Sequence, residues 1–205
     1  MKLYYAPGAC SLAPHIVARE AGLRFDLEKV DLRSGKTESG AAFSDINPKG
    51  YVPALELGNG EVLTEASALL QYLADQAPQA GLVPAAGTFE RYRLLEWLGF
   101  ISTELHKGFA PLWKPDTPEA SKTIAKNNLA KRFAYVDQHL ARGPFLLGER
   151  FTVADAYLFT ISSWANFHAL DLTPYPNLQA YLERVGARPK VREALSAEGL
   201  LKQAA

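Results

Sequence analysis

The sequence contains little cysteine and no excess of charge of either sign. Its 205 residues include one cysteine, Cys10. A lone cysteine excludes an intramolecular disulfide framework and a cysteine-based zinc cluster, and it is typical of a reducing cytoplasm. Lys plus Arg and Asp plus Glu each number 22, so the formal net charge is zero. Without a basic excess, no nucleic-acid partner is expected.

Long apolar runs are also missing. No segment approaches the roughly 20 apolar residues that a membrane-spanning helix needs, and the N-terminus lacks the apolar core of a secretory signal. We therefore expect a cytoplasmic protein with no membrane partner. Hydrophobic residues still make up 48% of the chain, which is typical of globular proteins with a sizeable core.

Strand and helix patterns alternate in the first 80 residues. Strands are expected at 2–5, 24–31, 54–57 and 61–64, and helices at 11–22 and from 66 to just before Pro78. Residues 32–50 are expected to be irregular, apart from a short helix near 43–46. Gly58-Asn59-Gly60 is a strong hairpin signal. The order β-α-β, connection, β-β-α predicts an α/β thioredoxin-like fold.

Strand patterns are absent after residue 88. Residues 81–88 indicate a linker, rich in glycine, proline and alanine. Helical patterns follow over 88–108, 119–141, 153–168, 177–187 and 190–197, separated by proline-containing breaks such as Pro111. The predicted organisation is a domain over 1–80, a linker over 81–88 and an all-helical domain over 89–205.

Cys10 follows the first strand, at or just before the start of the first helix. The N–H groups and dipole of a helix N-terminus favour a thiolate, so this position suits a reactive cysteine. A buried, small apolar residue is the alternative role. The run Cys10-Ser11-Leu12-Ala13 has no second cysteine, which excludes a dithiol oxidoreductase but leaves the use of an external thiol open.

Two further segments have a possible ligand-binding role. Pro53 directly precedes a strand; in a thioredoxin-like fold its peptide bond is cis, whereas an ordinary loop proline is trans. Thr64-Glu65-Ala66-Ser67 lies where a strand becomes a helix. Its N–H groups could bind a carboxylate and Glu65 an ammonium, or the segment could simply cap the helix.

Five motifs together resemble the bacterial beta-class glutathione transferases. They are YYAPGACSLAPHI, NPKGYVPAL, LTEASALLQYLAD, TELHKGFAPL and GERFTVADAYLF, and the match extends from Met1 to about Leu200. The resemblance implies a glutathione transferase fold, with a thioredoxin-like domain that binds glutathione and an all-helical second domain. It also implies a homodimer that takes glutathione as co-substrate, needs no metal, and acts on small apolar electrophiles.

The resemblance also implies roles for individual residues. Cys10 and His106 would lie near the glutathione sulfur as catalytic residues, with Lys107 nearby. Val52 would pair with the cysteinyl backbone ahead of cis-Pro53. The remaining implied glutathione contacts are Tyr51, Glu65 and Ala66, with Thr103 and Glu104 reaching glutathione on the partner subunit.

The chain departs from the family pattern at three positions. Many relatives have serine at Ala66, lysine at Gly35 and asparagine at Gly99. The hydroxyl and amide contacts are lost here, whereas Lys36, next to Gly35, is a candidate to replace the missing lysine.

Other notable side chains have structural alternatives. Thr152-Val153-Ala154-Asp155 is a capping box expected to start a buried helix. A solitary helical histidine such as His106 is often structural, although its titration suits proton transfer. Phe109, Trp113 and Trp164 could line an acceptor pocket or belong to the core.

Two functions are consistent with these features. In one, the enzyme lowers the pKa of bound glutathione, whose thiolate attacks an electrophile, and Cys10 adds thiol-transfer or dehalogenation chemistry. In the other, the chain is a non-catalytic protein of the same fold that binds ligands or docks to partners. The presence of Cys10, Glu65 and His106 together favours catalysis.

Overall fold

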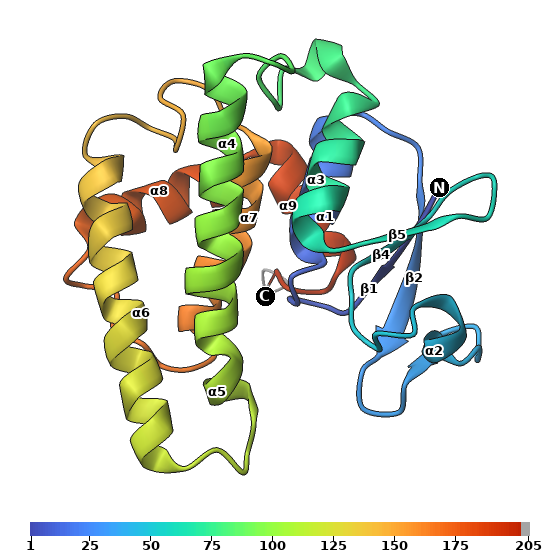
Figure 1. Ribbon diagram of the computed structural model, residues 1–205, viewed down its shortest axis with the longest axis horizontal. Coiled ribbons are helices and arrows are strands. Elements are labelled where there is room, and N and C mark those ends of the chain that lie inside the picture. The colour runs from blue at the N-terminus through green and yellow to red at the C-terminus, as the bar shows by residue number, and fades with distance from the viewer. Residues whose placement is uncertain (202–205) are drawn as a thin grey trace. The chain divides into compact units, whose positions relative to one another are not determined.

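The computed structural model describes residues 1–201, which form two compact units (Figure 1). The first unit consists of Met1–Val83 and the chain from Ala187 onwards, and the second consists of Pro84–Gly186. The predicted helical domain over 89–205 does not coincide with the second unit, because the last helix of that range belongs to the first unit. Residues 202–205 of the predicted domain lie outside the described residues.

The first unit is built on a five-stranded mixed sheet. Its strands are β1 (Lys2–Tyr5), β2 (Asp26–Asp31), β3 (Lys36–Thr37), β4 (Ala54–Glu56) and β5 (Val62–Thr64), in the order β3-β2-β1-β4-β5. β1 and β2 are parallel and the other neighbours are antiparallel. The thioredoxin-like prediction is thereby confirmed, but β3 was expected to be irregular. Its polar sequence has no alternation of apolar residues that would have indicated a strand.

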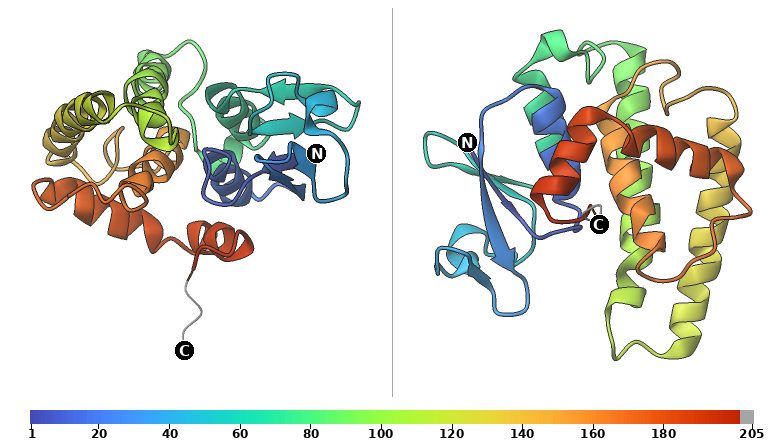
Figure 2. Two further views of the ribbon diagram at one scale, coloured as in Figure 1. Left: turned by 90° about the horizontal axis from the view of Figure 1, so that it is seen from below. Right: turned by 180° about the vertical axis from the view of Figure 1, so that it is seen from behind.

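Four helices and a short turn complete this unit. They are α1 (Leu12–Glu20), α2 (Phe43–Ile46), α3 (Ala66–Asp75), the 3-10 turn η1 (Pro78–Ala80) and α9 (Pro189–Ala197). α1 joins the parallel strands β1 and β2 and contacts both α3 and α9. Figure 2 shows α9, in red, beside α1, in dark blue.

The burial of α1 explains why α9 joins the first unit. Every side chain from Leu12 to Ala18 is buried, including the polar His15. A helix with one free face would show polar residues along that face, so α1 must be covered on all sides. α9 supplies part of that cover.

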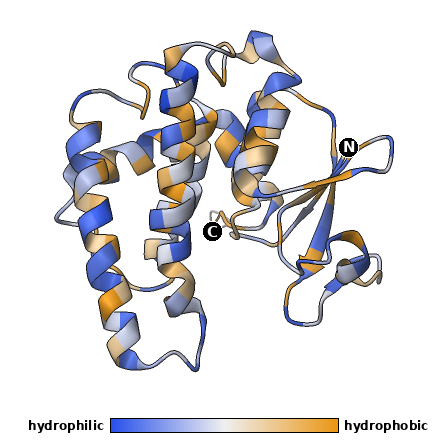
Figure 3. Ribbon diagram, in the orientation of Figure 1, coloured by the Kyte–Doolittle hydropathy of each residue, from blue (hydrophilic) through white to orange (hydrophobic). Residues whose placement is uncertain are grey.

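The second unit is helical. Its elements are α4 (Phe89–Phe100), the π-helical η2 (Ile101–His106), the 3-10 turn η3 (Lys107–Phe109), α5 (Ala110–Trp113), α6 (Glu119–Leu140), α7 (Val153–Ser162), the 3-10 turn η4 (Ser163–Ala165) and α8 (Pro176–Gly186). α7 is buried along its whole length and is the core helix. In Figure 3, hydrophilic and hydrophobic stretches alternate along α6. All the residues that α6 buries are apolar.

Three predictions about these helices need correction. The expected helix over 88–108 changes to π-helix at Ile101 and to 3-10 helix at Lys107. Pro111 does not end a helix but lies in the first turn of α5. Backbone N–H groups in the first turn have no acceptor within the helix, so a proline there removes no helical hydrogen bond. The helix expected over 153–168 ends as α-helix at Ser162 and as 3-10 helix at Ala165.

The capping box at the start of α7 is confirmed. The Asp155 carboxylate accepts hydrogen bonds from the Thr152 N–H and hydroxyl, each at 2.8 Å. It also accepts from the Leu146 N–H at 2.9 Å and the Tyr181 hydroxyl at 3.3 Å. Burial raises the pKa of Asp155 to about 6, against the opposing effect of these hydrogen bonds.

The helices give no sign of a membrane span. Within residues 1–201, none combines the length and the apolar character needed to cross a bilayer.

Candidate active site

Cys10 lies two residues before α1, in the turn that follows β1. Only 8% of its surface is exposed, and its thiol donates a hydrogen bond to the Val52 carbonyl at 3.2 Å. The Val52–Pro53 bond is cis, as expected. The first unit therefore brings together Cys10, Val52 and Pro53, which the sequence separates by more than 40 residues.

Glu65 has an unusual backbone at the junction of β5 and α3. Its φ of 71° and ψ of 119° lie outside the regions that non-glycine residues normally adopt. Such a conformation costs on the order of 1–3 kcal/mol and is found mostly at functional sites. Glu65 is the N-cap residue of α3, which begins at Ala66, but its side chain makes no capping hydrogen bond to the helix.

The Glu65 carboxylate already has cationic and phenolic partners. Its Oε1 accepts hydrogen bonds from the Lys49 ammonium at 2.6 Å and from the Tyr51 hydroxyl at 2.8 Å. The hydrogen bond to this carboxylate is the first cause of the raised pKa of both Lys49 and Tyr51. The Lys49 contact shows that the Glu65 carboxylate can accept an ammonium.

Lys49 is a residue that sequence reasoning missed. It belongs to the quoted NPKGYVPAL motif, but only the turn from Asn47 to Gly50 brings it to Glu65. Lys36, the predicted substitute for the family lysine, lies on the edge strand β3. β3 and β5 are at opposite edges of the sheet, so the structure does not bring Lys36 together with Glu65.

The second unit holds the other predicted residues in and after the π-helix. Nδ1 of His106 is hydrogen-bonded to the Tyr157 hydroxyl at 2.7 Å. The His106 ring also contacts the Trp164 ring edge-on, with 5.0 Å between the ring centroids. A π-helical turn inside a longer helix is frequent at functional sites. Lys107 follows directly, at the start of η3.

Glu104 and Thr103 have partners within their own unit. The Glu104 carboxylate forms an ion pair with Arg132 of α6, at 2.6 Å from one guanidinium nitrogen and 2.7 Å from another. The Thr103 hydroxyl donates to the Gly99 carbonyl at 3.1 Å. The Glu104–Lys107 pair that a regular helix would suggest is replaced by the pair with Arg132, because the π-turn changes the spacing of side chains.

The three aromatic residues predicted for an acceptor pocket, Phe109, Trp113 and Trp164, form one cluster, but they are exposed to different degrees. Phe109 is fully buried, whereas Trp113 is 47% exposed. Both contact Trp164 edge-on, at 5.6 and 5.4 Å between ring centroids. Trp113 also contacts His168 at 4.3 Å, and burial lowers the pKa of this histidine. Trp113 is thus the exposed member of the three predicted aromatics, and Phe109 is core.

Metal ligands do not gather in the described part of the chain. Within residues 1–201, no three His, Cys, Asp or Glu side chains are placed to hold a metal ion.

Comparisons with known proteins identify the family. The glutathione S-transferase N-terminal domain matches residues 8–76, and the C-terminal domain matches residues 103–198. Glutathione S-transferase GstA of Escherichia coli O157:H7 is 48% identical over 98% of this chain and 100% of its own. Two solved structures are similarly close.

A glutathione transferase from Methylococcus capsulatus is 61% identical, with a TM-score of 0.96 over 98% of this chain and 99% of its own. A sphingomonad glutathione S-transferase complexed with glutathione is 47% identical, with a TM-score of 0.95 over 98% of this chain and 100% of its own. The chain belongs to the glutathione S-transferase family.

Proposed function

We propose that the protein is a cytoplasmic enzyme that transfers glutathione to small apolar electrophiles. The observation that carries this proposal is the set of groups in the first unit: the Cys10 thiol on the Val52 carbonyl, cis-Pro53 and the strained Glu65 at the start of α3. A site with this backbone strain and a carboxylate that accepts ammonium suits the free α-amino acid end of glutathione.

Each end of glutathione has a counterpart among these groups. The γ-glutamyl carboxylate would take the N–H groups at the start of α3, including that of Ala66, and its ammonium would take Glu65 in exchange for Lys49. Val52 would pair with the cysteinyl backbone. Lys36 would meet the glycyl carboxylate in place of the family lysine.

The reaction forms one carbon–sulfur bond. The glutathione thiolate attacks an electrophilic carbon; with an aryl halide, the carbon–halogen bond breaks and halide leaves with the electron pair. The chain's part is to favour the thiolate, to which His106 and the helix N-terminus beside Cys10 would contribute. Each unit by which the thiol pKa falls is worth about 1.4 kcal/mol in favour of the thiolate.

Cys10 supports a second reaction. Its thiolate would attack oxidised glutathione, forming a mixed disulfide and releasing one glutathione thiolate, which is the first half of a thiol transfer. The placement of this thiol in the first turn before α1 favours such chemistry.

The second unit supports a homodimer. Phe89, Tyr92 and Leu95 recur every three residues on α4 and are 67%, 62% and 36% exposed. Exposed apolar stripes of this kind are typical of subunit interfaces. In a dimer, Thr103 and Glu104 would reach glutathione on the partner subunit, with Arg132 orienting the carboxylate. The division into a glutathione-binding domain over 1–80, a linker over 81–88 and a helical domain from 89 remains part of this proposal.

Turnover and binding tests separate the enzyme from a non-catalytic relative. The purified protein should conjugate a chromogenic aryl halide with glutathione and be retained on immobilised glutathione. Retention without turnover of any halide tested would instead favour the ligand-binding alternative, and failure of both would contradict a glutathione site.

A further inference from the structure

Glu198 is a buried carboxylate outside the groups discussed so far. It follows α9, near the end of the described chain, and its side chain is fully buried. Its Oε2 accepts a hydrogen bond from the Gly8 N–H at 2.9 Å, and its Oε1 lies 2.7 Å from Nδ1 of His15. A buried carboxylate is costly unless hydrogen bonds compensate for the lost water.

The hydrogen bonds determine the protonation state of His15. The Arg19 Nε donates to the His15 Nε2 at 2.8 Å. A guanidinium only donates, so Nε2 must be an unprotonated acceptor, and Nδ1 carries the proton. His15 is therefore neutral and donates to Glu198, whose negative charge is balanced by Arg19 across the imidazole.

The end of α9 fixes the position of Glu198. Gly199 has a φ of 71°, its N–H donates to the Ser196 carbonyl at 3.0 Å, and the Leu200 N–H donates to the Leu195 carbonyl at 2.8 Å. These two bonds form a Schellman motif, which ends the helix at a defined residue. The motif directs Glu198 toward α1 instead of solvent.

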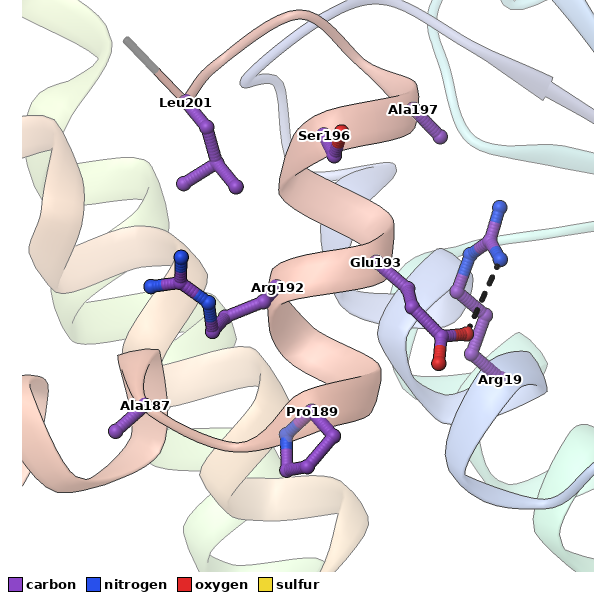
Figure 4. Close-up of a pocket in the computed structure, with 8 residues that line it drawn as sticks. All are labelled: Arg19, Ala187, Pro189, Arg192, Glu193, Ser196, Ala197 and Leu201. Carbon is purple, nitrogen blue, oxygen red and sulfur yellow. Dashed lines mark ion pairs between the residues drawn. The ribbon is translucent and has the colours of Figure 1, made fainter. Parts of the chain in front are cut away.

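Ion pairs hold α9 against α1 independently of Glu198. Arg188 binds both carboxylate oxygens of Glu20, at 2.7 and 2.9 Å. Arg19 lies 3.6 Å from Glu193, the pair marked in Figure 4, on the wall of an open pocket of about 770 Å³. These pairs are partly exposed, so each contributes little to stability. The contact between α9 and α1 therefore includes pairs other than the His15–Glu198 pair.

Gly8 belongs to the turn that presents Cys10. Its φ of 71° is in the left-handed region, and the turn is closed by the Ala9 N–H on the Ala6 carbonyl at 3.0 Å. The Ser11 hydroxyl accepts from the Ala6 N–H at 3.1 Å. Glu198 therefore holds the middle of a short turn whose next residues are Ala9 and Cys10.

We propose that Glu198, oriented by His15, is a positioning residue that fixes the Gly8–Cys10 turn and limits access to the Cys10 thiol. The last turn of the described chain would thereby control a group 188 positions earlier (198 − 10). The inference rests on the proposed role of Cys10, but the reactivity of its thiol can be measured without transferase turnover.

Glu198→Gln is the most informative substitution. Glutamine has nearly the same size, but the Gly8 N–H and the His15 Nδ1–H both donate, and an amide has one acceptor oxygen. Its NH₂ group must therefore face one of the two donors, and the turn should loosen. Glu193→Gln is the matched control, because it removes the exposed pair with Arg19 from the same helix.

The rate of Cys10 alkylation by iodoacetamide is the readout. At about pH 9, above the usual thiol pKa of ~8.5, this rate reports mainly on access. We expect Glu198→Gln to react at least about fivefold faster than wild type, because local opening exposes the thiol, and Glu193→Gln to stay within about twofold. Circular dichroism must show that both variants are folded.

A purely structural role makes a different prediction. If Glu198→Gln is folded, even if less stable, and alkylates at the wild-type rate, the proposal is overturned. Should the variant fail to fold, hydrogen exchange in wild type decides: a protected Gly8 amide supports the anchor, and fast exchange at Gly8 within a protected α1 refutes it. A wild type that does not conjugate glutathione, together with faster alkylation of Glu198→Gln, would count against the proposed function alone.

Discussion

The ammonium of Lys49 lies 2.6 Å from the carboxylate of Glu65, the group that is proposed to receive the ammonium of glutathione. The two side chains are 46% and 55% exposed, so solvent screens the pair and it contributes little to stability. A ligand that also uses the N–H groups of α3 can therefore displace Lys49 at little cost.

Substitutions at these two residues should have unequal effects on glutathione binding. Glu65→Gln removes a charge-assisted hydrogen bond worth roughly 1.5–3 kcal/mol, so KM for glutathione should rise at least about tenfold. Lys49→Met should change KM by less than about fivefold, because it removes only an exposed pair. Steady-state kinetics at varied glutathione measures both, and equal effects would show that Lys49 itself holds the ligand.

Cys10 should form a mixed disulfide with oxidised glutathione in the folded protein. Its place before α1 favours the thiolate, which forms when the thiol gives up its hydrogen bond to the Val52 carbonyl. Mass spectrometry should show one glutathione adduct, absent in Cys10→Ala. A thiol that is modified only after denaturation would be a structural residue.

The two residues of the capping box, Thr152 and Asp155, should contribute unequally to the free energy of unfolding. Thr152→Ala is expected to cost about 1 kcal/mol. Asp155→Ala leaves the buried Leu146 and Thr152 N–H groups and the Tyr181 hydroxyl without their acceptor, so we expect about 3 kcal/mol.

Urea denaturation of the two variants measures this difference. Turnover per folded molecule should stay near that of wild type for both. A large loss of turnover at unchanged stability would show that the box has a catalytic role.

Asp155 should also make stability depend on pH. Its pKa rises from 3.8 in the unfolded chain to about 6 in the folded one, so between these values the folded state binds more protons. Stability therefore falls as pH rises through this window, by at most about 3 kcal/mol, and is constant above it with respect to this group.

The Asp155→Asn variant isolates this effect. The free energy of unfolding of wild type minus that of the variant should decrease from about pH 4 to pH 6. A difference that increases with pH over that range would mean that the hydrogen bonds outweigh burial.

The dimer should depend on the apolar face of α4. Sedimentation is expected to report about twice the chain mass of 22.5 kDa. Tyr92→Asp should shift the equilibrium toward the monomer, because it places a charge in the apolar stripe. Ile124→Asp on α6 is the control, since this side chain is equally exposed, at 61%, but lies outside the stripe. A monomeric wild type with full activity would refute sites shared between subunits.

The sequence was sufficient to predict those features that depend on neighbouring residues or on the recognised fold. Strands β1, β2, β4 and β5, the cis bond before Pro53 and the box at Thr152 each depend on neighbouring residues or on the recognised fold. The π-turn could not be predicted, because its hydrogen-bond pattern depends on burying Ile101 and Leu105 while His106 reaches Tyr157 of another helix.

Long-range partners were beyond the reach of sequence patterns. The apolar face of α9 indicates that the helix is covered, but not that α1 covers it. Likewise, Lys49 meets Glu65 only through a turn and a hairpin whose relative placement no single motif encodes. Lys36 was preferred because it adjoins Gly35; sheet order separates it from Glu65, but its expected partner is the glycyl carboxylate, and that contact stays a prediction.

The π-turn at Ile101–His106 also affects how this chain tolerates a change of length. A π-turn contains about one residue more than an α-turn, so it is equivalent to a single insertion already absorbed by the helix. Deleting one residue there is expected to restore α-helical bonding without rotating the side chains that follow. A deletion within α4 or α6 would instead rotate all later side chains by about 100°. Changes of length are normally tolerated in loops, but here we expect a helical segment to tolerate one, the π-turn that carries His106.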